Sequence, residues 1–201
     1  PVVAAPFGLT LGGGAEICLG ADALQAHAEL YMGLVEVGVG LIPGGGGCFG
    51  LLHNRQGDGP DIDPVVYLRD TFMTIGMAKV ATSAEEARGM GFLKPTDRVT
   101  MDREELLFGA KARALGMAGS DYRPMRPRRL KAAGRDGYAT LYATLWGMED
   151  AGQISAHDRR VGSALSRVLS GGDVAAGTEV TEKRFLELEQ EEFLSLCGEP
   201  K

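Results

Sequence analysis

Glycine is concentrated at the start of this chain. Thirteen of the 30 glycines lie in the first fifty of 201 residues, and seven of them form two runs, at residues 12–14 and 44–47. A glycine run interrupts a regular strand or helix, because glycine has no Cβ and adopts backbone conformations that other residues avoid. The same fifty residues carry only four charged side chains, Glu16, Asp22, Glu29 and Glu36. This pattern predicts a buried platform shaped by its backbone, followed by more highly charged helices.

The overall composition argues against several classes of function. The formal net charge is −6, whereas binding to nucleic acid or to an anionic surface needs clustered Lys and Arg. We therefore expect no nucleic-acid partner, and no membrane insertion, because the longest uncharged runs are too short and too rich in Gly and Pro. The cysteines Cys18, Cys48 and Cys197 lack Cys-x-x-Cys spacing. They predict reduced thiols in a cytoplasmic protein, and no metal site.

Hydrophobic periodicity predicts a chain of the α/β class, long enough for one domain or two small ones. The sequence favours a strand at 1–10, a turn at Gly12, Gly13 and Gly14, and a helix at 15–22. Further strands are expected at 23–28 and 92–95, a loop at 57–64 and an irregular basic segment at 123–131. Further helices are expected from about Cys48, at 70–77, from the capping box at Ser83 to Gly91, and from 102 to about 118. The last three expected helices lie at 138–151, 157–169 and 182–196.

Two motifs suggest ligands but have simpler interpretations. Residues 45–50 fit Gly-x-Gly-x-x-Gly, but a dinucleotide site needs a second strand where the loop at 57–64 is expected. A basic run predicts either a phosphate clamp or, more simply, a solvated linker. It consists of Arg123, Arg126, Arg128, Arg129 and Lys131. We favour neither ligand interpretation.

The two glycine turns each carry a carboxylate. Taken alone, Glu16 is a first-turn acid favoured by the helix dipole, and Glu36 is an exposed acid on a half-buried strand. Taken together they indicate chemistry. A glycine turn that opens a helix presents unpaired N–H groups, which suit an oxyanion, and Glu16 follows Gly13 by three residues. A second carboxylate at Glu36 completes the pair that general acid and base catalysis requires.

These motifs together resemble the second half of the enoyl-CoA hydratase/isomerase (crotonase) superfamily. They are PVVAA at 1–5, LGGGAE at 11–16, Glu36, IPGGGG at 42–47 and SAEEA at 83–87. The resemblance covers about residues 1–100, and it implies a partial spiral of ββα units there with a mainly helical extension at 101–201. The later part, with LSGGD at 169–173, resembles the tail of bacterial 3-hydroxyacyl-CoA dehydrogenases that end in a hydratase-like domain.

The resemblance also implies a site and a substrate. Gly13, between Gly12 and Gly14, corresponds to a backbone donor to the thioester oxygen of an acyl-CoA. Glu16 corresponds to the base that activates water, Glu36 to the acid that protonates C2, and Gly44 to a backbone position that orients the water. This hydration needs no cofactor, since the substrate itself carries coenzyme A.

The resemblance implies that the family's first half, with its adenine-binding loop and second oxyanion donor, would lie before the position of Pro1. We therefore expect a fragment that is a weak catalyst alone, with NAD needed only in the absent part of a parent. Two alternatives stay open. The chain is part of a multifunctional NAD-dependent dehydrogenase, or it is a non-catalytic assembly domain, and a homo-oligomer is compatible with each. An apolar stripe of the last helix would serve docking in the second case, although covering the chain's own platform is the simpler use; it consists of Leu186, Leu188, Phe193, Leu194 and Leu196.

Overall fold

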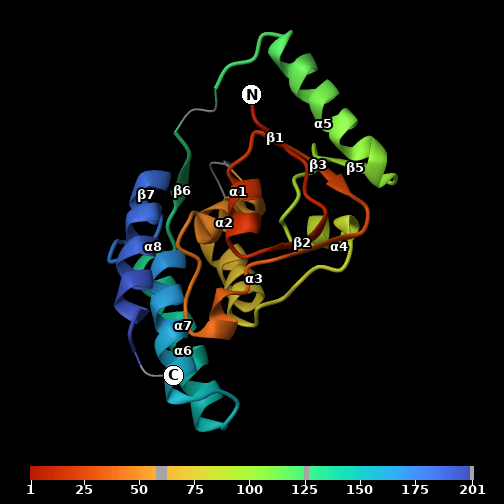
Figure 1. Cartoon of the computed structure of the whole chain (residues 1–201). Helices are drawn as coiled ribbons and strands as arrows, with labels where there is room; N and C mark the ends of the chain where they lie inside the picture. The colour runs from red at the N-terminus through yellow and green to blue at the C-terminus, as the bar shows by residue number, and fades with distance from the viewer. Residues whose placement is uncertain (58–62, 125–126, 200–201) are drawn as a thin grey trace.

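Short parallel strands form one side of the molecule. The structure, a computed structural model, describes residues 1–57, 63–124 and 127–199. In it β1 (Val3–Ala4), β3 (Ala23–His27) and β5 (Arg98–Thr100) form a parallel sheet with β3 in the centre, while β2 (Gly8–Leu11) pairs in parallel with β4 (Leu30–Gly33) (Figure 1). The single strand expected at 1–10 is therefore wrong. Pro6 lies between β1 and β2, and because it has no N–H it cannot donate to a ladder.

Four helices follow the glycine turns and the strands. They are α1 (Gly13–Leu19), α2 (Gly47–Gln56), α3 (Pro64–Gly76) and α4 (Ala84–Gly89). α3 begins before the expected residue 70, because the Asp63 side chain accepts from the Val65 N–H and Pro64 suits the first helical position. The predicted cap of α4 is confirmed, since the Ser83 hydroxyl accepts from the Glu86 N–H at 3.1 Å.

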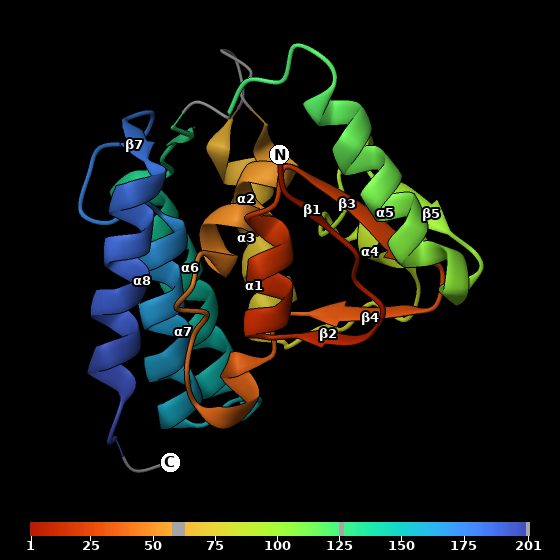
Figure 2. The same ribbon diagram turned by 45° about the horizontal axis from the view of Figure 1, so that its top comes forward.

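The strand expected at 92–95 is wrong, and β5 lies a few residues further on. Phe92 and Leu93 are buried in the core without pairing as a strand. The Asp97 carboxylate then closes a turn by accepting from Lys94 N–H at 2.7 Å, and it also accepts from Leu24 N–H of β3 at 2.8 Å. α5 (Arg103–Ala118), capped by Asp102 as expected, packs over this sheet (Figure 2).

The C-terminal part is a group of three helices with a small ribbon. The helices are α6 (Gly134–Asp150), α7 (Ala156–Leu169) and α8 (Glu182–Leu196), which has the predicted bounds. The ribbon pairs β6 (Arg129–Lys131) with β7 (Glu179–Thr181) in antiparallel register. The expected irregular segment at 123–131 thus contains a strand, and its residues 125–126 lie outside the described residues. No helix in the described ranges is long and apolar enough to cross a membrane.

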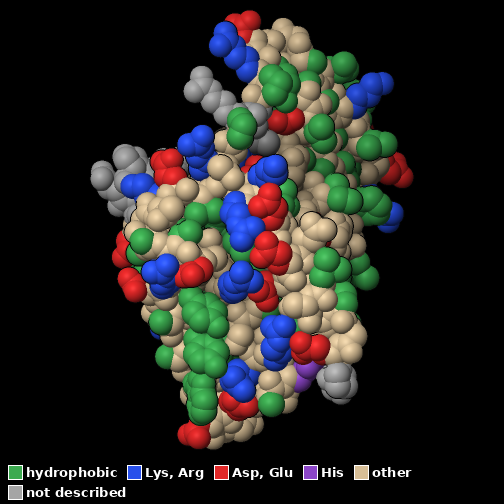
Figure 3. Space-filling view, turned by 90° about the vertical axis from the view of Figure 1, so that its left-hand side faces the viewer, with side chains coloured by type: hydrophobic (Ala, Val, Ile, Leu, Met, Phe, Trp, Pro, Cys, Tyr) green, Lys and Arg blue, Asp and Glu red, His purple; other side chains and the backbone are tan. Residues whose placement is uncertain are grey.

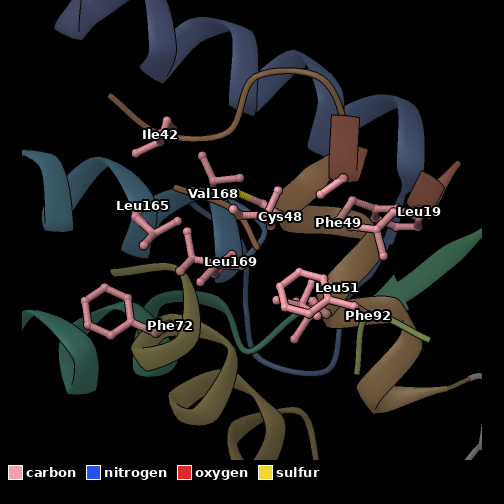
Figure 4. Packing of buried hydrophobic residues seen from close by; sticks show 14 of the residues in the cluster. Leu19, Ile42, Cys48, Phe49, Leu51, Phe72, Phe92, Leu165, Val168 and Leu169 are labelled. Carbon is pink, nitrogen blue, oxygen red and sulfur yellow. The ribbon is translucent and has the colours of Figure 1, made fainter. Parts of the chain in front are cut away.

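One continuous hydrophobic core joins the two sides of the molecule. Figure 2 shows α1, α2 and α3 between the strands and the C-terminal helices. Cys48 of α2 lies beside Val168 of α7 in the core (Figure 4), and the Phe49 and Phe185 ring centroids are 5.3 Å apart. The C-terminal helices thus bury the platform. The expected boundary between the crotonase-like part at 1–100 and the helical extension at 101–201 stays a prediction.

The outer face of the C-terminal helices is charged. Acidic and basic side chains alternate across it (Figure 3). The ion pairs of these helices include Arg160–Glu199, Arg167–Glu191 and Arg184–Glu191. Exposed pairs of this kind contribute little stability each. The face is typical of a solvated surface.

Candidate active site

The N-terminus of α1 presents two free backbone donors. Gly12 caps the helix at φ 54°, and its N–H donates to the Gly33 carbonyl at 2.9 Å. The Ala15 and Glu16 N–H groups both donate to the Gly12 carbonyl. This leaves the N–H groups of Gly13 and Gly14 without an acceptor among the described residues, and both glycines are exposed. Gly13 is thus free to donate to a ligand, whereas Gly12 is not.

Glu36 lies directly against this turn. It opens a 3₁₀-helix, η1 (Glu36–Val39), so its expected place on a strand is wrong. A Cβ on Gly12 would lie 3.0 Å from the Oε1 atom of Glu36. The absence of a side chain at Gly12 therefore lets the carboxylate approach the start of α1.

The Glu36 carboxyl group is poorly solvated. Its Oε2 atom is buried and has no hydrogen-bond partner in the described part of the chain. Burial raises the pKa of Glu36, and the negative charge of Glu16 raises it further. Both effects favour the protonated form, as a proton donor requires.

Glu16 joins the first glycine turn to the second. Its Oε1 atom accepts from the Gly45 N–H at 2.7 Å and from the Gly47 N–H at 2.9 Å. Gly44 is exposed, and its N–H meets no acceptor within the described ranges. A Cβ at Gly44 would lie 3.0 Å from the Phe193 ring of α8, which borders this turn.

A third carboxylate, Glu189 of α8, was missed in the sequence. Its Oε2 atom accepts from the Gly46 N–H at 2.6 Å and its Oε1 atom from the Phe49 N–H at 3.1 Å. Glu189 is fully buried, and this burial, together with the charge of Glu16, raises its pKa to about 8. Glu16 and Glu189 thus both hold the second glycine turn, while Glu36 lies against the first.

The face of α8 that packs on the platform differs from the predicted stripe. The buried positions are Phe185, Leu188, Glu189, Glu192 and Leu196. Leu186 and Leu194 are instead 38% and 60% exposed. The sequence did contain a signal for Glu189. It lies four residues after Phe185, and this helical spacing places it on the same buried face of α8.

The dinucleotide interpretation of residues 45–50 does not fit. The N–H groups that would meet a pyrophosphate already donate to Glu16 and Glu189. Residues 58–62 of the loop expected at 57–64 lie outside the described residues. The phosphate-clamp interpretation also weakens. Arg128 pairs with Glu182 and Arg129 with Glu179, while Arg126 lies outside the described residues.

The three cysteines are free thiols, as expected. Burial raises the pKa of Cys18 to about 11. Cys48 is the second residue of α2, and burial, together with the charges of Glu189, Glu16 and Glu36, raises its pKa well above the ordinary value. Neither buried thiol is therefore activated as a nucleophile. The described residues contain no group of three His, Cys, Asp or Glu placed to hold a metal ion.

Comparisons with known proteins support the resemblance. No protein-family model matches the chain. It is 49% identical over its whole length to a probable 3-hydroxyacyl-CoA dehydrogenase of Bacillus subtilis, but it spans only 25% of that relative. A 47-residue stretch is 51% identical to a mitochondrial methylglutaconyl-CoA hydratase of Mus musculus, and covers 15% of it.

Solved structures of known proteins have the same fold as this chain. A carnitinyl-CoA hydratase from Mycobacterium avium superposes with a TM-score of 0.55 at 22% identity, covering 99% of this chain and 55% of that one. An enoyl-CoA hydratase/isomerase from Acinetobacter baumannii gives 0.53 at 19% identity, covering 100% and 61%. The expected partial crotonase-like α/β fold is confirmed.

Substitution of Gly12 tests its contact with Glu36. Gly12→Ala places a methyl group against the Glu36 carboxylate and holds alanine at a positive φ. We expect the free energy of unfolding in urea to fall by about 1–3 kcal/mol. Gly14→Ala is the matched control, because it has open space and a helical backbone, and we expect no loss. Equal losses in the two variants would contradict this account.

The buried Glu189 predicts a pH dependence of stability. Its pKa in the fold is about 8 against an ordinary 4.5, so the folded chain holds a proton that the unfolded chain releases between these values. The free energy of unfolding should therefore fall as pH rises from about 4.5 to about 8. In urea unfolding across this range, Glu189→Gln should flatten the decline. Glu187→Gln, on the exposed face of α8, should keep the wild-type slope, and equal slopes in both variants would exclude Glu189 as the source.

Proposed function

We propose that this chain, whose fold is that of the crotonase superfamily, carries part of a hydratase site that adds water to a trans-2-enoyl-CoA. The observation that carries the proposal is that Glu16 and Glu36 both lie against the first glycine turn, where the Gly13 N–H is free within the described residues. The two acids come from separate glycine-flanked elements, and the charge of Glu16 acts on Glu36. Both carboxylates are needed for hydration, whereas thioester hydrolysis and dehalogenation do not require the pair.

In this proposal the thioester oxygen accepts a hydrogen bond from Gly13. As water attacks C3, negative charge builds up on that oxygen, and a fixed donor stabilises the enolate-like state more than the ground state. Gly13 suits this role, because its N–H is exposed and meets no acceptor in the described part of the chain. The Gly44 N–H also meets no acceptor in the described part of the chain, and it is the proposed donor to the attacking water.

The two glutamates divide the proton transfers. Glu16 removes a proton from the water as its oxygen bonds to C3, and Glu36 delivers a proton to C2, so the sum is addition of one water across the double bond. The raised pKa of Glu36 supports its assignment as the donor. The two N–H donors to Glu16 support its assignment as the base, because they hold its carboxyl group in one position beside the Gly44 turn. Double-bond isomerisation uses the same groups and is the second candidate.

We propose further that the chain works within a longer parent. The resemblance covers only the second half of the family's fold, and the chain spans a quarter of the Bacillus subtilis relative. The oxidation that this relative's name describes requires a dinucleotide site, which the occupied N–H groups at 45–47 do not provide. Any such oxidation belongs to another part of the parent.

Conservative substitution in the longer parent tests the proposed roles. We expect Glu16→Gln and Glu36→Gln each to lower kcat for crotonyl-CoA hydration by about 10²- to 10⁴-fold, while 3-hydroxyacyl-CoA oxidation is unchanged. Glu29→Gln, an exposed acid on a neighbouring loop, is the control for charge alone.

Glu36→Gln is the more informative variant, because the Oε2 atom of Glu36 has no hydrogen-bond partner in the described structure, whereas the Oε1 atom of Glu16 also holds the second turn. Full hydration by both variants would overturn the proposal. We expect the 201-residue chain alone to hydrate crotonyl-CoA about 10²-fold or more slowly than the parent, because the resemblance implies that the second oxyanion donor belongs to the family's first half.

A further inference from the structure

The second glycine turn is held from two sides. The N–H groups of Gly45 and Gly47 both donate to the Oε1 atom of Glu16. The N–H group of Gly46, which lies between them, donates instead to the Oε2 atom of Glu189. Glu16 belongs to α1, near the start of the chain, and Glu189 belongs to α8, near its end. Two acids from distant elements therefore fix three successive peptide groups.

The glycines of this turn make its conformation depend on these hydrogen bonds. The run at 44–47 has no side chain that restricts its backbone, and Gly46 adopts φ 103°. A side chain would not fit in its place, because a Cβ on Gly45 would lie 2.8 Å from Glu16 and one on Gly46 would lie 3.3 Å from Leu186. The acceptors on each side therefore keep the turn in one conformation.

One face of α8 runs along this turn and the start of α2. Glu189 is fully buried, and its Oε1 atom accepts from the Phe49 N–H at 3.1 Å. Phe185, four residues earlier on α8, packs against the Phe49 ring with centroids 5.3 Å apart. Phe193, four residues later, borders Gly44, where a Cβ would lie 3.0 Å from its ring. The carboxyl group of Glu189 is therefore held firmly against the turn.

Glu189 is a costly residue for this position if its role is packing alone. Burial of an acid opposes folding, and no basic side chain among the described residues bonds to Glu189. An apolar side chain would fill the space without that cost, but it would leave two N–H groups without an acceptor. Buried acids with a raised pKa, as here, are frequent at functional sites. What the carboxyl group supplies is the pair of acceptors.

The turn carries two groups that the proposed hydration uses. Gly44 supplies the N–H for the attacking water, and Glu16, the proposed base, is bonded to the residues that follow. If the Gly46 N–H lost its acceptor, the turn would stay bonded to Glu16 but would be anchored from one side only. The base and the water would then shift together relative to the substrate.

We propose that Glu189 is a positioning residue for hydration, which holds Glu16 and the Gly44 N–H in line with C3 of the substrate. It acts only through the turn, because its side chain is fully buried and makes no contact with the substrate. This inference rests on the proposed function. It adds to it a requirement for α8, the last helix of the chain, in the water-adding step.

Two reactions at one site, measured in the longer parent, separate positioning from folding. Hydration of crotonyl-CoA needs a water at C3, which Glu16 and Gly44 hold under the proposed function. Exchange of the C2 protons of butanoyl-CoA in deuterium oxide needs no such water. The Glu36 carboxylate removes a C2 proton, Gly13 stabilises the enolate, and a deuteron from the solvent bonds to C2 in place of the proton. Exchange therefore reports the folded site without the second turn.

We expect Glu189→Gln to lower kcat for hydration by about 10- to 100-fold, because a small displacement of a reacting group has an effect of this size. An amide nitrogen has no free lone pair, so glutamine does not hold both the Gly46 and the Phe49 N–H groups. The KM and the rate of C2 exchange should stay within about threefold of the wild-type values. Unchanged hydration would overturn the proposal, and so would an equal fall in hydration and exchange.

Glu192→Gln is the matched control. Glu192 lies on the same helix and is 8% exposed, but it pairs with Arg167 of α7 and not with the turn. Removal of its charge tests the cost of altering a buried acid on α8, and the ratio of hydration to exchange should stay at the wild-type value. A fall in this ratio as large as that in Glu189→Gln would overturn the proposal.

Glu16→Gln distinguishes a failure of this inference from a failure of the proposed function. Hydration that does not depend on Glu16 would remove the proposed function, and this inference with it. Hydration that depends on Glu16 but not on Glu189 would remove only the positioning role.

Discussion

The N-terminus of α2 is the point on which the rest of the structure depends. Two carboxylates from opposite ends of the chain, Glu16 and Glu189, accept four backbone N–H groups there. A helix N-terminus attracts negative charge through its unpaired donors and its dipole, so it is a suitable place for buried acids. Glu189 has no basic side chain bonded to it in the described structure, and these donors are its main compensation for burial.

This cap explains how helices from distant parts of the chain form one site. Glu16 ties α1 to the second glycine turn, and Glu189 ties α8 to the same turn from the other side. The Phe49–Phe185 contact continues this attachment into the core. The C-terminal helices therefore support the reactive geometry directly as well as burying the platform. The charge of Glu16 in this cap also raises the pKa of Glu36.

The local features of the fold were predictable from the sequence. The glycine turns, the caps at Ser83 and Asp102 and the bounds of α8 all follow from residues close together in the chain. The short strands β6 and β7 were not predicted, because their pairing joins segments about fifty residues apart and each has only three residues. The contact between Gly12 and Glu36 was likewise beyond sequence pattern, although both residues were candidates. Glu189 was missed because its partners lie 140 or more residues away.

Amide hydrogen exchange of the 201-residue chain tests the central claim, that two carboxylates hold the start of α2, most directly. The amides of Gly45, Gly46, Gly47 and Phe49 should be protected, whereas those of Gly13, Gly14 and Gly44 should exchange rapidly. In Glu189→Gln, protection should fall at Gly46 and Phe49 and persist at Gly45 and Gly47. Rapid exchange at all four amides of the wild-type chain would contradict the account, as would a uniform loss of protection in the variant.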